Sequence, residues 1–248
     1  MALPQYSART LQRRLRLAKA LDIQQAQTLE HETATAFAAK PRVHDIPFPA
    51  GLGPVPQPMQ PTPALLDALP KVDVVAMVDT VAEAAAMADV LTPGTQSTQW
   101  YHYARHFKEH YLPLVGPAGP SHKSRRLGNY FLTKINGIQV LCYKTELHLV
   151  RDAKKVPNGS YTVPIQDMLQ QIIQEAQPLV FLTTGTSGGV YTSMHLGDVV
   201  VTRAARFYCQ SHFKSAPFNN QTYTSPWTIP TKYRAVAHQL LEVIQHRQ

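Results

Sequence analysis

The hydrophobic pattern of this chain changes its period several times between residues 72 and 182. Residues 72–78, VDVVAMV, form an almost continuous apolar run, which is typical of a strand buried on both faces of a parallel sheet. Residues 80–91, TVAEAAAMADVL, are predicted to be a helix. Thr80 and Glu83 have the spacing of a capping box, and Pro93-Gly94 is expected to end the helix. A strand followed at once by a helix is the first indication of an α/β fold.

The alternation of strands and helices continues further along the chain. Asn136-Gly137 lies between two apolar stretches, which predicts a two-residue β-hairpin. The stretch VPIQDMLQQIIQEAQP, residues 163–178, is predicted to contain a helix with Pro164 in its first turn and Pro178 after its end. One apolar face is made of Ile165, Met168, Leu169, Ile172, Ile173 and Ala176. LVFL, residues 179–182, is expected to be a buried strand. The valine run after Gly197-Asp198 predicts another strand, and residues 231–245 predict a closing helix.

The segments before residue 71 have a different composition. Residues 7–39 are rich in Ala, Leu, Gln and Arg and predict a helical arm, although residues 1–21 lack acidic side chains, as some targeting presequences do. Residues 41–70 are dense in proline and are interpreted as a linker, or as a strap laid over a surface. We therefore expect an N-terminal arm over 1–40, a linker over 41–70 and an α/β domain over 71–248.

Together these elements predict a three-layer α/β/α domain with a mainly parallel or mixed central sheet. In such sheets ligands bind outside the carboxyl ends of the strands. Residues 144–149, KTELHL, follow a predicted strand, and either Glu146 or His148 can face that end. The sequence does not fix which.

Composition narrows the class of partner. The formal charge is +8, but the basic residues are scattered, so nucleic-acid binding is not expected. The basic residues in and beside the segment 95–130 are interpreted as a solvated loop, with contact to an acidic ligand such as a nucleotide phosphate as the alternative: Arg105, Lys108, Lys123, Arg125 and Arg126. No apolar run is long enough for a membrane span. Cys142 and Cys209 form no CxxC motif, which favours a reducing, cytoplasmic setting.

Residues 100–111 are predicted to be helical and carry three histidines. His102, His106 and His110 would then lie on one stripe, which suits either a transition metal or an ordinary polar surface. We prefer the surface interpretation, and neither a metal nor a cofactor is expected.

The glycine cluster TTGTSGG, residues 183–189, follows the predicted strand 179–182 and precedes LGDVVV, residues 196–201. It matches neither the dinucleotide fingerprint GxGxxG nor a phosphate-binding P-loop. The pair of motifs resembles the purine nucleoside phosphorylase and nucleosidase superfamily, in which a strand ends in a glycine-rich turn and Gly-Asp-Val opens the next strand. The preceding helix and the unit over 72–91 are similar to that superfamily as well.

That resemblance implies cleavage of the N-glycosidic bond of a purine nucleoside or nucleotide. Glu83 matches the place of the family's acidic residue, the base that activates water in nucleosidases, although a capping box explains it equally well. The implied sugar- and anion-binding residues are the turn and the segment after it: Gly185, Thr186, Ser187, Gly188, Gly189, Arg203, Arg206, Phe207 and Phe213. The aromatic residues after the Gly-Asp strand, with Phe218 and Tyr223, suit either base stacking or a core. Asp198 is interpreted as structural.

Water is preferred over phosphate as the acceptor. Thr183 stands where phosphorylases of the superfamily have an arginine that holds phosphate, and threonine cannot make the bidentate contact. Phosphate stays open as a co-substrate, with Arg203 or Arg206 as its ligand.

The family's ribose-binding glutamate and base-protonating aspartate would follow the point where this sequence ends. The chain is therefore interpreted as part of a longer enzyme, as one completed by a partner, or as a shortened relative that binds without catalysis. A sheet interrupted here has an unpaired edge, so we expect a homo-oligomer, a partner that completes the sheet, or the proline-rich strap over that edge. A non-catalytic binding or assembly subunit is the alternative function.

Overall fold

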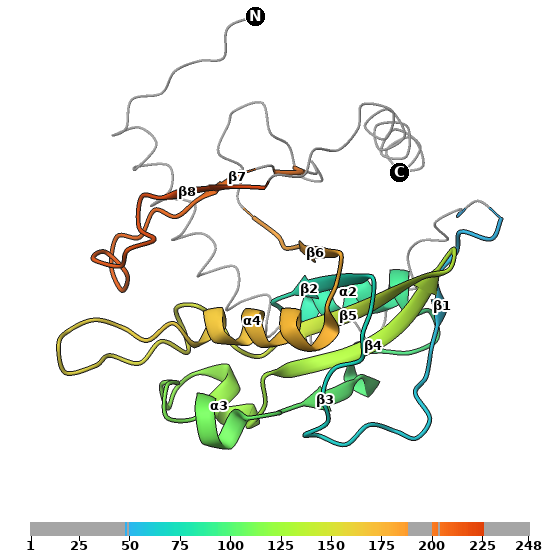
Figure 1. Ribbon diagram of the computed structural model, residues 1–248, viewed down its shortest axis with the longest axis horizontal. Helices are drawn as coiled ribbons and strands as arrows, with labels where there is room; N and C mark the ends of the chain where they lie inside the picture. The colour runs from blue at the N-terminus through green and yellow to red at the C-terminus, as the bar shows by residue number, and fades with distance from the viewer. Residues whose placement is uncertain (1–47, 49, 188–199, 203, 226–248) are drawn as a thin grey trace, which may run out of the picture. The chain divides into compact units, whose positions relative to one another are not determined.

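The computed structural model describes residue 48 and residues 50–187, 200–202 and 204–225 (Figure 1). The chain divides into two compact units, Met1–His195 and Leu196–Gln248. The boundary falls inside the range 71–248 that the sequence assigned to one domain. The predicted helices over 7–39 and 231–245 lie outside the described residues.

The first unit is built on a mixed sheet of six strands, which confirms the α/β class. Its main path runs β1-β4-β5-β2-β6, and β3 pairs with β4 beside β1. The central β2 is parallel to both of its neighbours, β5 and β6. β4 is antiparallel to each of its partners, β1, β3 and β5. The strands are β1 (Val55–Pro56), β2 (Val74–Val78), β3 (Tyr101–Tyr103), β4 (Gly128–Ile135), β5 (Ile138–Thr145) and β6 (Val180–Thr183).

The hairpin between β4 and β5 has the predicted two-residue turn. Ile135 pairs with Ile138, so only Asn136 and Gly137 remain in the loop. Their φ angles are 47° and 84°. A tight hairpin turn needs this left-handed backbone at both positions, and asparagine and glycine tolerate it best.

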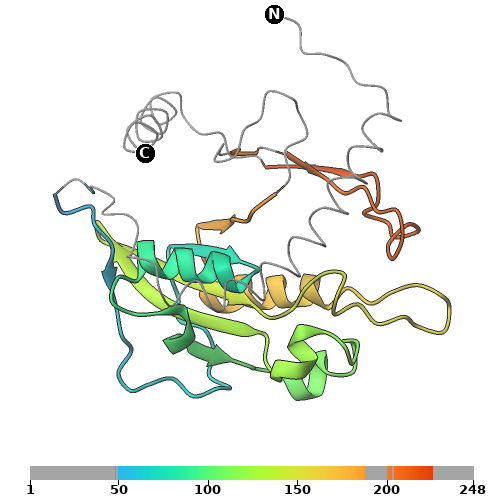
Figure 2. The ribbon, with the colours of Figure 1, turned by 180° about the vertical axis from the view of Figure 1, so that it is seen from behind.

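Helices α2 (Val81–Leu91) and α4 (Pro164–Ala176) cover opposite faces of the sheet. Along β2, Val75 and Met77 join the cluster that contains Met168 and Ile172 of α4, together with Leu141 and Tyr143 of β5. Ala76 and Val78 point the other way and pack with Ala84, Met87 and Ala88 of α2. Accordingly, α4 lies in front of the sheet in Figure 1 and α2 in front in Figure 2. Burial on both faces explains the continuous apolar run in β2.

Both helices begin and end as the sequence predicts. The Thr80 side chain accepts from the backbone N–H of Glu83, whose carboxylate accepts from the Thr80 N–H, so the capping box is formed. Pro164 is in the first turn of α4, and Gln177 closes that helix in a left-handed conformation.

The predicted helix over 100–111 is wrong. Tyr101–Tyr103 form β3, and His106 has a φ of 59° before a π-helical turn at Phe107–Tyr111. Pairing with β4 overrides the local preference and buries Tyr103 and Trp100. The three histidines therefore do not share a helical stripe.

The described part of the proline-rich segment lies against the sheet. Val55 and Pro56 pair with Lys134 and Thr133 at the edge of β4. The backbone N–H of Met59 donates to the Tyr101 hydroxyl, and Leu69 is buried. Compact packing thus begins before Lys71. Two short helices precede strands along the chain: η1 (Ser97–Gln99) comes before β3, and α3 (Pro120–Ser124) comes before β4.

β6 has the predicted position but is not a buried strand. Its burial falls from half-buried at Val180 to exposed at Leu182 and Thr183, and Leu179 before it is 85% exposed. Among the described residues β6 pairs only with β2, so one side of the strand has no neighbour that could bury it. Val200–Thr202 have no strand conformation, and the rest of the predicted valine strand lies outside the described residues.

The described part of the second unit is a small antiparallel pair, β7 (Ala204–Arg206) and β8 (Thr222–Thr224). Aromatic rings pack together beside it. Phe218 lies 5.5 Å from Phe207 and 5.6 Å from Phe213 between ring centroids, and Phe207 lies 5.8 Å from Tyr223.

Candidate functional site at the carboxyl ends of the parallel strands

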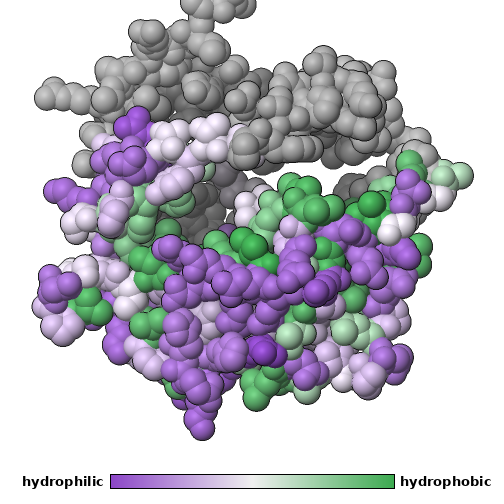
Figure 3. Space-filling view, viewed as in Figure 1, coloured by the Kyte–Doolittle hydropathy of each residue, from purple (hydrophilic) through white to green (hydrophobic). Residues whose placement is uncertain are grey.

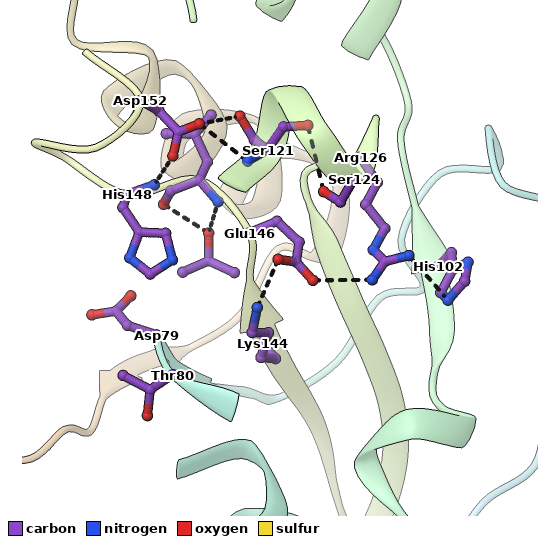
Figure 4. A network of polar contacts seen from close by, with 12 residues as sticks. Asp79, Thr80, His102, Ser121, Ser124, Arg126, Lys144, Glu146, His148 and Asp152 are labelled. Atoms are coloured by element: carbon purple, nitrogen blue, oxygen red, sulfur yellow. Dashed lines mark hydrogen bonds and ion pairs between the residues drawn. The ribbon is translucent and has the colours of Figure 1, made fainter. Parts of the chain in front are cut away.

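Polar side chains gather where the parallel strands β5, β2 and β6 end. Asp79 and Thr80 follow β2, Lys144 lies near the end of β5, and residues 184–187 follow β6. Because these strands run in the same direction, their carboxyl ends meet at one edge of the sheet. Figure 4 shows the β2 and β5 part of this edge.

Glu83 joins the end of β2 to the turn after β6. Its Oε2 accepts from the backbone N–H groups of Asp79 and Thr80 at 3.1 and 2.9 Å. Its Oε1 accepts from the N–H and the hydroxyl of Thr186 at 2.8 and 3.0 Å. The carboxylate therefore holds the glycine-rich turn against the start of α2.

These hydrogen bonds also set the charge state of Glu83. Partial desolvation works to raise its pKa, but the backbone N–H groups of Thr186, Thr80 and Asp79 outweigh it and hold the pKa below its ordinary value. A carboxylate with a lowered pKa and both oxygens occupied is a weak base. The role of Glu83 as the water-activating base stays a prediction.

Gly185 lies beside the Glu83 carboxylate. A Cβ at this position would lie 3.4 Å from Glu83 Oε1. The turn is anchored on its other side by the Thr184 N–H, which donates to Met77 O at 2.9 Å and continues the pairing of β6 with β2. The first glycine of the predicted cluster is thus next to Glu83.

Asp79 and His148 form a second group at this edge. The sequence left the position of His148 open and did not single out Asp79. The His148 ring points toward the Asp79 carboxyl in Figure 4, and each side chain acts electrostatically on the other. Desolvation raises the pKa of Asp79, which the charge of His148 partly offsets while that of Glu83 adds to it. Desolvation lowers the pKa of His148, as does the charge of Lys144, and Asp79 opposes both.

The backbone of His148 is fixed by a buried carboxylate. Asp152 Oδ2 accepts from the His148 N–H at 2.7 Å, while Oδ1 accepts from the N–H and hydroxyl of Ser121 at 3.1 and 2.6 Å. Asp152 has no exposed surface. The Thr145 hydroxyl donates to Leu147 O and accepts from its N–H, which fixes the bend between β5 and His148.

A chain of charges continues from Lys144 toward β3. Glu146 pairs with Lys144 at 2.8 Å and with Arg126 at 3.1 Å, and Arg126 also contacts the His102 ring at 3.3 Å. All three charged side chains are at least three-quarters buried. Within the part of the chain that the structure describes, Arg126 Nε and Asn129 Oδ1 have no hydrogen-bond partner. The interpretation as a solvated loop is wrong for Arg126, because its side chain is largely buried against Glu146.

The other predicted residues lie at the end of the turn, outside the described residues, or in the second unit. Ser187 is exposed at the end of the turn. Gly188, Gly189, Arg203 and Asp198 lie outside the described residues. Arg206 is exposed in β7, and the rings of Phe207 and Phe213 pack in the aromatic cluster of the second unit.

A surface groove of about 710 Å³ lies away from this edge, between the π-helical turn and α4. Hydrophilic side chains dominate the face of α4 seen in Figure 3. Within the groove wall the side chains satisfy one another: Glu175 accepts from the Tyr103 hydroxyl, and the Tyr111 hydroxyl donates to Gln171. Burial raises the pKa of Tyr111 in the groove wall, which keeps that phenol neutral. The strand ends instead hold a carboxyl group and an imidazole with shifted pKa values, Asp79 and His148, and we take them as the better candidate site.

Sequence reasoning missed Asp79 and Asp152. Asp79 directly follows the last residue of a predicted strand, so its position at the carboxyl end was a signal that the capping residues beside it obscured. Nothing in the local sequence links Asp152 to Ser121, because the contact joins α3 to the loop after β5, 31 residues further along the chain.

No protein-family model, curated protein or solved structure matches this chain. Among residues 48, 50–187, 200–202 and 204–225, no helix has the length and apolar character needed to cross a membrane. Over the same ranges no three histidine, cysteine or acidic side chains are arranged to hold a metal ion.

Proposed function

We propose that this protein cleaves the N-glycosidic bond of a purine nucleoside or nucleotide, with water preferred over phosphate as the acceptor. The observation that supports this best is the contact between the turn Thr184–Ser187 and Glu83, beside Asp79, at the carboxyl ends of three parallel strands. The motif that suggested the function therefore lies next to acidic groups, at the edge where α/β sheets bind ligands.

The reaction needs three things that this edge can supply. Positive charge develops on the sugar as the C–N bond breaks, and the carboxylates of Glu83 and Asp79 stabilise such a charge. Sugar hydroxyls need donors and acceptors, which the exposed Ser187 and, as an acceptor, the Thr186 hydroxyl oxygen offer. The attacking water needs a group that accepts its proton.

The preference for water rests on Thr183. This residue ends β6 and is exposed at the start of the turn, where a neutral side chain offers phosphate no bidentate contact. Arg203 and Arg206 remain the proposed phosphate ligands if phosphate is the acceptor, and Phe207 and Phe213 the proposed stacking residues.

The finer architecture is part of the same proposal. We infer a three-layer α/β/α arrangement preceded by an N-terminal helix and a proline-rich strap, in a cytoplasmic homo-oligomer or in a complex whose partner completes the sheet. Binding of a membrane or of nucleic acid is not part of the proposed function, nor is a resident cofactor.

The test is release of free base by the full chain from adenosine, guanosine and their 5′-monophosphates, followed by chromatography with and without phosphate. We expect release in phosphate-free buffer. Release that strictly requires phosphate, with sugar 1-phosphate as product, would change the acceptor but keep the bond. No release from any of these substrates would reject the proposed activity.

One observation favours a second candidate, a non-catalytic nucleoside- or nucleotide-binding subunit. Both carboxylate oxygens of Glu83 accept two hydrogen bonds each, which suits a rigid binding turn as well as a reacting one. Calorimetry with the same compounds separates the two, because binding heat without base release supports the second candidate. If the protein shows neither binding heat nor base release, the function that remains is an assembly role.

A further inference from the structure

We propose that His148, held beside Asp79, accepts the proton of the attacking water in the reaction at this edge. The inference rests on the proposed function and adds the residue that the resemblance does not supply. It is drawn from the position of the His148 ring, its fixed backbone and the charged groups that surround it.

The first argument is placement. His148 follows the end of β5, and Asp79 follows β2, the strand that pairs in parallel with β5. The Asp79 backbone N–H donates to Glu83, the carboxylate that holds the glycine-rich turn, and the Asp79 carboxyl is close enough to His148 for the two to interact electrostatically. A substrate seated on that turn would lie near both Asp79 and His148.

The backbone of His148 is held in place, whereas its ring makes no hydrogen bond with any described residue. The His148 N–H is bonded to the buried Asp152, so the loop cannot easily carry the ring away. No described residue donates to or accepts from the imidazole nitrogens, and none hydrogen-bonds the Asp79 carboxyl. Both oxygens of Glu83, in contrast, are occupied.

The third argument is charge. The groups that act on the His148 ring are Lys144 from β5, Asp79 from the end of β2, and Asp152 and Arg151 from the loop after it. Burial and Lys144 favour the neutral ring, and a neutral imidazole is the form that accepts a proton. Asp79 then stabilises the imidazolium once it forms.

The step balances without any further reactant. A ring nitrogen of neutral His148 takes one proton from water as the water oxygen bonds to the anomeric carbon. The C–N bond breaks, and its electron pair leaves with the base nitrogen. The base takes up a proton from solvent and His148 returns its own, so one water is consumed per bond cleaved.

The test compares His148→Gln and Glu83→Gln in the full chain, with His110→Gln as the matched control on a different surface. We expect His148→Gln to lower kcat by about 10²–10⁴-fold, the usual contribution of a positioned base, and to remove the acid limb of the kcat/KM profile. Glu83→Gln is expected to retain that limb, because it disturbs the turn and not the proton acceptor. His110→Gln should match the unsubstituted protein.

A second readout does not depend on turnover. In NMR titrations the His148 Cε1–H signal, assigned with His148→Gln, should titrate at lower pH in Asp79→Asn than in the unsubstituted protein, since a carboxylate that stabilises the imidazolium has been removed. Asp89→Asn on the exposed surface of α2 serves as its control.

The outcomes separate the two proposals. If the unsubstituted protein releases no base, the proposed function fails and the role of His148 fails with it. If it releases base but His148→Gln keeps the acid limb, or Glu83→Gln alone removes it, the function stands and the base is not His148. An unchanged His148 titration in Asp79→Asn would refute the pairing directly.

Discussion

Two carboxylates at the same edge of the sheet each join distant segments of the chain, and they do so in different surroundings. Asp152 is fully buried and ties the loop after β5 to α3 through Ser121. Glu83 ties the turn after β6 to the start of α2 through bonds that lie at the surface. Both accept backbone N–H groups, but only Glu83 is reached by solvent.

This difference in burial indicates which side of the edge is fixed and which can respond to a ligand. A buried acceptor cannot be replaced by water, so losing it leaves its donors unsatisfied. A surface acceptor can be exchanged for water or for a ligand at low cost. The β5 side, with His148, is therefore the rigid half of the candidate site, and the turn after β6 is the half that a substrate can displace.

Gly119 illustrates how closely the rigid half is packed. A Cβ there would lie 2.1 Å from Asp152 Oδ1 and 3.0 Å from its Cα, so no side chain fits between α3 and the carboxylate. The Gly116 N–H donates to Asp152 O at 2.9 Å in the same corner. At the other carboxylate, the nearest glycine, Gly185, would need only a small adjustment.

The largest effect should come from Asp152→Ala. The change leaves the Ser121 N–H and hydroxyl and the His148 N–H without an acceptor, and each buried unsatisfied donor costs roughly 1–3 kcal/mol. We expect the free energy of unfolding to fall by about 3–4 kcal/mol, measured by urea titration with circular dichroism. Asp89→Ala, an exposed acid on α2, should change it by less than about 0.5 kcal/mol. Equal effects of the two variants would remove the distinction between the buried and the surface carboxylate.

Glu83→Gln should have a smaller effect that depends on pH. The substitution replaces one oxygen by an NH2 group that cannot accept, so two of the four donors lose their acceptor and the other two keep only a neutral one. A capping interaction of this kind is worth about 1 kcal/mol. Because the folded protein holds the pKa of Glu83 below its ordinary value of 4.5, the carboxylate stabilises the fold above that pH. This contribution is lost as the pH falls from 4.5 through the lowered pKa.

The measurement is urea unfolding of Glu83→Gln and of the unsubstituted protein between pH 3 and pH 7. The gap in unfolding free energy should be widest near neutral pH and close toward the acid end. A gap that stays constant with pH would mean that the charge of Glu83 does not stabilise the turn.

The same contrast explains what the sequence could predict. Elements whose signals are local were predicted correctly: the Thr80-Glu83 cap, the Asn136-Gly137 turn and Pro164 at the start of α4. Each depends on residues within four positions of one another, and the backbone geometry there has few alternatives.

Elements that depend on pairing between distant segments were not predicted correctly from the sequence. Tyr101 and Tyr103 are in a strand because β4 lies beside them, and Tyr103 pairs with Gly128, 25 positions further along the chain. The exposure of β6 follows from having β2 as its one described neighbour, which the apolar sequence LVFL cannot reveal. The local apolar pattern looks the same for a central strand and an outer one.

The candidate site follows the same rule. Glu83, Gly185 and Thr186 were found because each belongs to a recognisable motif, and the structure does bring them together. Asp79 and His148 belong to no motif. They become neighbours only when β2 and β5 pair in parallel, so their relation depends on the topology of the sheet.

The smallest effect should come from Asp167, an aspartate in α4 that forms a short, exposed ion pair. Asp167 pairs with His110 at 2.9 Å, a shorter contact than several in the candidate site, yet both side chains are more than 40% exposed. Exposed pairs contribute little, because solvent screens them and ordering two side chains costs entropy. We expect Asp167→Asn to change the unfolding free energy by less than about 0.5 kcal/mol in the same urea titration. Short distance alone would then be a poor guide to stabilisation in this protein, and burial, which separates Asp152 from Asp167, the better one. A loss as large as that of Asp152→Ala would overturn this ranking and make the surface of α4 part of the rigid framework.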